Sequence, residues 1–384
     1  MKLRTAVALL LVWGSASGAH SPSGLAAAPA GPPGKATPGS PAGKAPYDAE
    51  TSTTARIDIK IDAKAAREIL SSLARLKPEI SDVKVLEDMP AVRAAIQDSS
   101  RDPTVFERDF AAAYESETRA AVFDFRSIRE KRDRWEVLVE GVLAREADLV
   151  RLSQRRAAAL LPADRPSAAR LEVFFSFGLP GLEDHLVIRS AQGPERMVID
   201  FARALGDAEG ETPEGRISRL SRLIAGEAFR QAWSHYREES PAWTRPDPGL
   251  GPLEPFLKIV AAAGPVGLFN VDENFFPLSV WLKDPDKRAI EELNRRAERF
   301  VSSQENLDAR MELLAEVRRP EFARRIAAPI GVFLADAIAQ EAGVAGLRTA
   351  LEQGPRAFFA AYERASQKYK SLVPLAKSIK DKLK

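Results

Sequence analysis

The chain has 384 residues, of which 45% are hydrophobic, so it can form one large folded domain or two. Its 56 basic and 54 acidic residues leave a net charge of +2. A balance of this kind gives no broad field that would attract nucleic acid or an anionic membrane, so we expect neither as a partner. The chain has no cysteine, which excludes disulfides, thiolate metal sites and cysteine nucleophiles.

The N-terminal residues have the pattern of a secretory signal peptide. Lys2 and Arg4 precede an apolar run at 6–13, and small residues end at Ala19. We therefore expect a cleaved signal at 1–19 and an exported protein, in a bacterial periplasm or outside the cell. No later stretch is expected to be long enough to cross a bilayer, so we expect no integral membrane segment after cleavage.

The next segment, 20–54, is rich in Ala, Pro, Gly and Ser. It cannot bury enough apolar surface to offset its ordering entropy, which predicts a disordered linker. We place a single folded domain at 55–384. Residues 56–62 alternate polar and apolar side chains and predict a half-buried strand. Helical patterns follow in the N-terminal part of the domain, about 55–165, at 63–76, 83–97, 103–114 and 125–161.

The middle of the domain, about 170–240, has a different pattern. A β-rich run at 171–177 and two shorter ones, 186–189 and 197–201, predict a small sheet. Beyond Pro213 one apolar stripe at helical spacing predicts a long helix; its members are Ile217, Leu220, Ile224, Ala228 and Ala232.

The last part, about 250–384, is mainly helical, and we expect interruptions at 241–255, 264–277, 320 and 354–355. The predicted fold class is therefore α+β, mainly helical, with a small central sheet, one long helix after it and a C-terminal helical bundle. The lysines of the last stretch, from Lys368 to Lys384, could contact acidic surfaces, but a solvated helix end is the favoured interpretation.

Local motifs for nucleotide and hydrolase chemistry are absent: the sequence has no Gly-rich phosphate loop, no dinucleotide fingerprint and no Gly-x-Ser-x-Gly elbow. Only three histidines occur, and His20 lies beside the predicted cleavage site. His185, which we expect to be solvated in a loop, and His235 remain as candidates for a general base or a metal ligand. Two histidines are too few for most zinc sites.

The order of strands and long helix nevertheless resembles the core of gluzincin-type zinc metallopeptidases, whose helix carries His-Glu-x-x-His. Here Gly226, Glu227 and Arg230 stand at the first, second and last of these positions. Residues 256–264 resemble the family's second helix, with Ala263 at the place of the third zinc ligand. Residues 329–338 and the apolar residues up to Tyr362 resemble its closing helices. Over about 56–365 the chain thus resembles uncharacterised bacterial zinc-dependent peptidases of this type.

The resemblance implies that all three zinc-ligand positions are degenerate. Gly226 has no side chain, Ala263 has no donor atom, and Arg230 is a permanent cation that repels a divalent metal. Glu227 would be a relic of the general base, because without zinc nothing lowers the pKa of a bound water. We therefore expect no cofactor and a catalytically inactive, metallopeptidase-like protein that binds a peptide or a protein in the remnant cleft.

Glu227 and Arg230 are spaced at i and i+3, which favours a structural ion pair. An anion-binding cleft around Arg230 is the alternative. Gly226 inside a helix costs about 1 kcal/mol relative to Ala, which indicates either close packing of a neighbouring element or drift after ligand loss. The aromatic residues nearby are expected to form core more often than to line a cleft; they are Trp233, Trp243, Phe269, Phe275, Phe276 and Trp281.

His235 begins a segment that resembles the inverted zinc motif His-x-x-Glu-His with Glu239 in the last place. An imidazole at a helix end near Trp233 and Tyr236 is the favoured interpretation. Two alternative functions stay open. One is an active hydrolase with an atypical site that uses Glu227 and His235, with zinc as its cofactor. The other is a structural protein of the cell envelope.

Overall fold

The computed structural model describes residues 54–76, 79–98, 102–115, 121–180, 184–189, 193–206, 211–270, 284–303, 306–319 and 322–384. All of them belong to one compact unit, Lys44–Lys384. The predicted signal peptide at 1–19 and the predicted linker at 20–54, apart from Thr54, lie outside these ranges.

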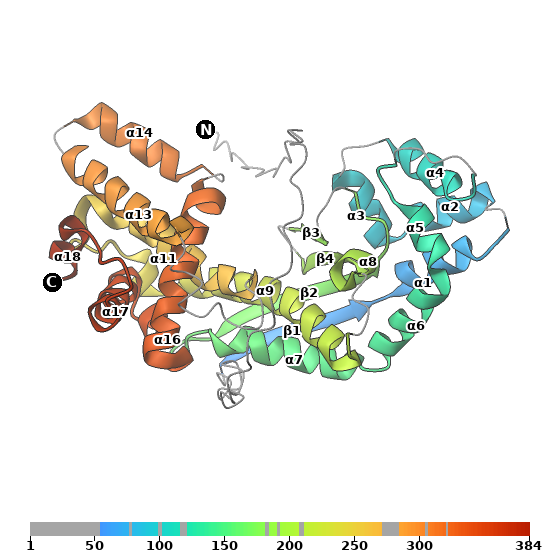
Figure 1. Ribbon diagram of the computed structural model, residues 1–384, viewed down its shortest axis with the longest axis horizontal. Coiled ribbons are helices and arrows are strands. Elements are labelled where there is room, and N and C mark those ends of the chain that lie inside the picture. The colour runs from blue at the N-terminus through green and yellow to red at the C-terminus, as the bar shows by residue number, and fades with distance from the viewer. Residues whose placement is uncertain are drawn as a thin grey trace, which may run out of the picture. The chain divides into compact units, whose positions relative to one another are not determined.

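A four-stranded sheet forms the centre of the fold (Figure 1). Its strands are β1 (Ala55–Asp62), β2 (Ser167–Ser176), β3 (His185–Ile188) and β4 (Glu195–Asp200), in the order β1-β2-β4-β3. The first two pairings are parallel and β3 runs antiparallel to β4. The predicted strands are confirmed. The sheet is larger than the sequence indicated, because β1 pairs with β2 along its whole length.

Two long helices, α7 (Glu146–Ala159) and α9 (Pro213–Glu239), contact each other and the sheet, α7 through β1 and α9 through β2. Alternate side chains of β2 are buried, among them Val173 and Phe175, while Ala168 and Arg170 are exposed. The second half of β2 is buried on both faces, since Phe174 is also buried. The helix α3 (Pro90–Asp98) contacts β2, β4 and β3. Burial of β2 is therefore complete on one face and partial on the other.

Before β2 the chain forms more helices than predicted. The 83–97 pattern is two helices, α2 (Ile80–Glu87) and α3, because Pro90 begins a new one. The 125–161 pattern is three: α5 (Phe125–Glu130), α6 (Arg132–Leu143) and α7. Their breaks at Lys131 and at 144–145 contain no Pro or Gly, so composition gave no signal for them. The remaining helices here, α1 (Lys64–Leu73) and α4 (Pro103–Ala112), match prediction.

The part of the chain after α9 is a helical bundle. It contains α10 (Pro241–Thr244), α11 (Glu254–Gly267), α13 (Asp284–Ser302), α14 (Leu307–Val317), α16 (Ala328–Glu352), α17 (Pro355–Lys368) and α18 (Lys377–Leu383). Three short elements of the described residues lie between these helices: η2 (Gly251–Leu253), η3 (Leu268–Asn270) and η5 (Ala323–Ala327). One more short helix, α8 (Phe201–Leu205), lies before α9. The protein thus has the predicted α+β, mainly helical fold class.

The two helices α11 and α16 cross at a pair of glycines. A Cβ atom added to Gly264 would lie 2.4 Å from the carbonyl oxygen of Gly331, so the backbones are in direct contact. The interruption predicted at 264–277 begins later than predicted, because α11 continues through Gly264 and Pro265 and ends at Gly267. The predicted break at Gly354 is confirmed by its positive φ of 95°. The predicted break at Pro320 lies outside the described residues.

The helix α16 corrects a second expectation. By length and composition it could cross a membrane, whereas we expected no stretch after the signal peptide to be long enough. Most of its apolar window is buried inside the fold, where it contacts α11 and α17. A buried core helix passes the same test of length and composition, so this helix is weak evidence of a membrane segment.

Candidate functional site

The candidate site lies on α9. This helix begins after Thr212, whose hydroxyl accepts a hydrogen bond from the amide of Gly215 at 3.1 Å, with Pro213 in the first helical position. Its predicted apolar stripe is buried. Glu227 and Arg230 are three residues apart and so lie one helical turn from each other. Burial of the stripe fixes the rotation of α9 about its axis, and in this rotation Arg230 contacts Glu195 of the strand β4.

Arg230 joins two carboxyl groups from different elements. Its Nε donates to Oε1 of Glu227 at 2.8 Å, and its Nη2 donates to Oε2 of Glu195 on β4. The side chains of Arg230, Glu227 and Glu195 are 21%, 9% and 14% exposed. The predicted ion pair is present, and it is part of a mostly buried network of three groups. Glu195 could not be predicted from the sequence as a partner of Arg230, because no local spacing links it to a helix that begins 18 residues later.

The two carboxyl groups differ in their affinity for a proton. Burial raises the pKa of Glu195 to about 7; Arg230 opposes the shift and Glu227 reinforces it. Burial also acts to raise the pKa of Glu227, but the hydrogen bond and charge of Arg230 outweigh it, so this pKa lies below its usual value. Near neutral pH Glu195 can therefore hold a proton, while Glu227 carries the negative charge that Arg230 neutralises.

Gly226 allows a close contact between α9 and η3. A Cβ atom at this position would lie 2.9 Å from the Cβ of Phe269. This distance confirms the close packing that the glycine indicated. The ring of Phe269 lies 5.1 Å from that of Phe229, which stacks on Trp233. Trp233, Trp243 and Phe269 are buried core residues, whereas the predictions for Phe275, Phe276 and Trp281 fall outside the described residues.

Ala263 lies on α11, which is held against α9 by a hydrogen bond from Nε1 of Trp233 to the carbonyl oxygen of Ala262 at 2.9 Å. The residues at the three inferred ligand positions do not fit a zinc ion, because they offer no side chain, a guanidinium and a methyl group. Within the described ranges, no group of three or more His, Asp or Glu side chains is placed to hold a metal ion.

The two histidines lie apart from this network. His235 is exposed on α9, and eight residues of helix place it about 12 Å along the axis from Glu227. The structure therefore does not bring these two candidates together. His185 was expected in a solvated loop. It is instead the first residue of β3, partly buried, with its Nδ1 2.6 Å from Oδ1 of Asp184.

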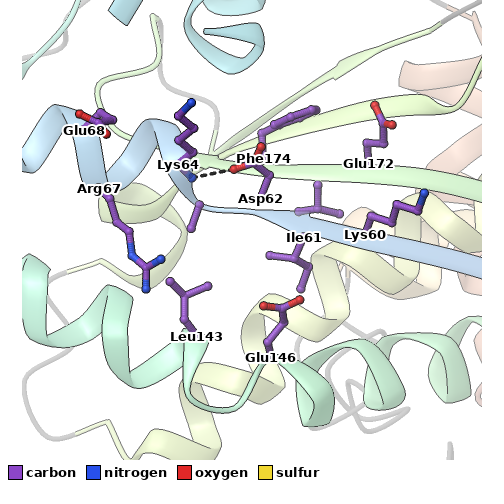
Figure 2. A pocket seen from close by; sticks show the side chains of 12 residues that line it. Lys60, Ile61, Asp62, Lys64, Arg67, Glu68, Leu143, Glu146, Glu172 and Phe174 are labelled. Carbon is purple, nitrogen blue, oxygen red and sulfur yellow. Dashed lines mark hydrogen bonds between the residues drawn. The ribbon is translucent and has the colours of Figure 1, made fainter.

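A separate pocket of about 700 Å³ lies at the end of β1 and the start of α1. Figure 2 shows acidic and basic side chains together on its walls, among them Lys60, Glu146 and Glu172. Arg67, also on its wall, pairs with Glu140 at 2.7 Å. Glu195, Glu227 and Arg230 do not line this pocket, and its mixed charges select no ligand class.

Comparison of the chain with family models, with curated proteins and with solved structures found no match.

Proposed function

We propose that this chain is an exported, catalytically inactive metallopeptidase-like protein that binds a peptide or a protein beside α9. The observation that carries the proposal is the network of Glu195, Glu227 and Arg230. The resemblance to gluzincins puts a zinc ligand at position 230. In this chain position 230 holds an arginine, and Glu227 neutralises its charge. Glu227 is the residue that the zinc-dependent reaction would require as its general base.

Glu227 is poorly placed for base catalysis. A general base needs a free lone pair within hydrogen-bond reach of a water or substrate proton. The Oε1 atom of Glu227 accepts two hydrogen bonds from Arg230, and its side chain is buried. The guanidinium of Arg230 keeps its proton at ordinary pH, so loss of that proton cannot break its ion pair with Glu227. On this proposal the scaffold is kept while the chemistry is lost, and that combination favours a binding role.

The two alternatives gain less support. A hydrolase that uses Glu227 and His235 needs both groups at one reacting atom, and about 12 Å of helix separates them. A purely structural envelope protein gives no reason for a buried three-member charge network, because an apolar core of the same volume is often equally stable or more so.

The test combines metal analysis with peptide binding. A decapeptide mixture is incubated with the purified protein, with and without added zinc, and retained and cleaved peptides are identified by mass spectrometry. We expect less than stoichiometric zinc, retention of some peptides and no cleavage. Stoichiometric zinc with chelator-sensitive cleavage would contradict the proposal, and so would the absence of any retained peptide.

Two matched variants locate the binding surface. Arg230→Gln removes the cation of the network, whereas Arg219→Gln removes an ion pair with Glu211 near the start of the same helix. We expect the first variant to change the set of retained peptides and the second to leave it unchanged. Equal effects of both variants would show that peptides bind elsewhere.

A further inference from the structure

A second arginine lies on the same side of α9 as Arg230, two turns further along. Seven residues rotate a helix by nearly two full turns and advance it by about 10 Å, so Arg237 follows Arg230 on one face. Ser234 lies between them on that face. Both arginines are partly buried. They differ in what surrounds the guanidinium.

Arg230 has two carboxyl partners, whereas Arg237 has no ion pair with any acidic side chain of the described residues. The Nη2 atom of Arg237 makes one long hydrogen bond to the Oγ of Ser234, at 3.4 Å. Its guanidinium lies over the ring of Trp233, 5.6 Å from the centroid. Its Nε atom is buried and has no hydrogen-bond partner. With protein groups of the described residues, this side chain therefore makes only one hydrogen bond.

Burial acts to lower the pKa of both arginines, but the net pKa shifts are opposite. For Arg230 burial acts to lower the pKa, but the carboxyl groups of Glu227 and Glu195 outweigh it and the pKa is raised. For Arg237 burial lowers the pKa, and only the charge of its exposed neighbour Glu238 opposes the shift. A buried cation without a partner is costly, and an anion of the right shape would remove that cost.

The planar guanidinium selects the anion. It presents donors in a fixed fork that matches the two oxygens of a carboxylate, and it can do so while its face rests on an aromatic ring. The Ser234 hydroxyl can add a further donor to the same ligand. We propose that Arg237 binds a carboxylate of the peptide partner, either its C-terminus or an acidic side chain. This inference rests on the proposed function of peptide binding.

The first experiment tests the anion site with small probes. Propionate and its neutral analogue propionamide are titrated at constant ionic strength, and the Nε–H signals of the arginines are followed by NMR. The Arg237 signal is the one that disappears in Arg237→Gln. We expect a saturable shift of this signal with propionate and none with propionamide. Chloride is titrated in the same way as a control anion. If chloride shifts the Arg237 signal as much as propionate does, the site binds an adventitious ion only, and the proposal is overturned.

The second experiment distinguishes the two sources of carboxylate. A peptide retained in the mixture experiment is made in four versions, with a free or amidated C-terminus and with or without its acidic side chains. We expect loss of one carboxylate source to weaken binding about tenfold, the usual worth of a charge-assisted hydrogen bond. Arg237→Gln should abolish that difference, Arg237→Lys should restore part of it, and Arg219→Gln should leave it intact.

The outcomes separate this inference from the function on which it rests. If the wild type and Arg237→Gln bind all four versions equally, the carboxylate site is refuted and peptide binding stands. If no peptide binds the wild type, the proposed function fails, and the peptide carboxylate site fails with it. The Arg237→Gln protein should still fold, because Arg237 has no ion pair within the described residues and its removal therefore leaves no carboxylate there without a partner.

Discussion

Replacement of Glu195 by glutamine should make the protein more stable at high pH and change little at low pH. Glutamine has the shape of the protonated acid and cannot ionise. The pKa of Glu195 is raised from 4.5 to about 7 in the folded protein. The folded state therefore binds this proton more tightly than the unfolded state. Its contribution to stability is complete below pH 4.5 and is lost as the pH rises through 7.

The magnitude follows from the size of this shift. Each pKa unit corresponds to about 1.4 kcal/mol, so the full shift from 4.5 to about 7 corresponds to at most about 3.5 kcal/mol. Solvent screens part of the interaction, because the network is only mostly buried, and we expect a difference of about 1 to 2 kcal/mol. The Glu195→Gln protein should thus match the wild type at pH 4.5 and exceed its free energy of unfolding by this amount at pH 8.

Urea unfolding, followed by tryptophan fluorescence between pH 4.5 and 8, measures the effect. Other groups titrate in this range, so the difference between the two pH profiles is the quantity that isolates Glu195. The control is Glu172→Gln on the neighbouring strand β2, which removes a surface ion pair with Arg196; its profile should run parallel to that of the wild type. Parallel profiles for Glu195→Gln, or a variant that is less stable at pH 8, would refute the reasoning.

Three glycine substitutions test the packing, each measured by its urea midpoint. Gly226→Ala gains helix propensity but forces its Cβ against that of Phe269, so we expect a net loss of about 1 kcal/mol; a gain would show that η3 moves freely. Gly141→Ala, in α6, meets nothing within 4 Å and should gain up to about 1 kcal/mol. Gly264→Ala would place its Cβ 2.4 Å from the Gly331 oxygen, so we expect a loss of about 3 kcal/mol; a loss below that of Gly226→Ala would contradict the crossing described.

Much of the fold followed from periodicity. The apolar stripe that begins at Ile217 predicted α9, and the alternation in 56–62 predicted β1, because burial on one face imposes a repeat of 3.6 or 2 residues. The breaks inside 125–161 could not be predicted in this way. A turn between two amphipathic helices needs no special residue when the helices pack on the same core, as at Lys131.

The candidate site was predictable only where it is local. The Glu227–Arg230 pair lies within one helix, so its spacing alone indicated it. Glu195 reaches the same guanidinium from β4, and that contact depends on how α9 packs against the sheet. Arg237 was missed for a related reason: an unpaired arginine is recognisable only when the positions of all nearby carboxylates are known.

The contact between Gly226 and Phe269 also constrains the order in which substitutions can accumulate. Any larger residue at 226 meets the Cβ atom of the residue at 269, so only a glycine at 269 would open this space without a shift of η3. A substitution at 226 therefore costs stability unless position 269 changes first or η3 shifts, and Gly226→Ala alone is expected to cost about 1 kcal/mol.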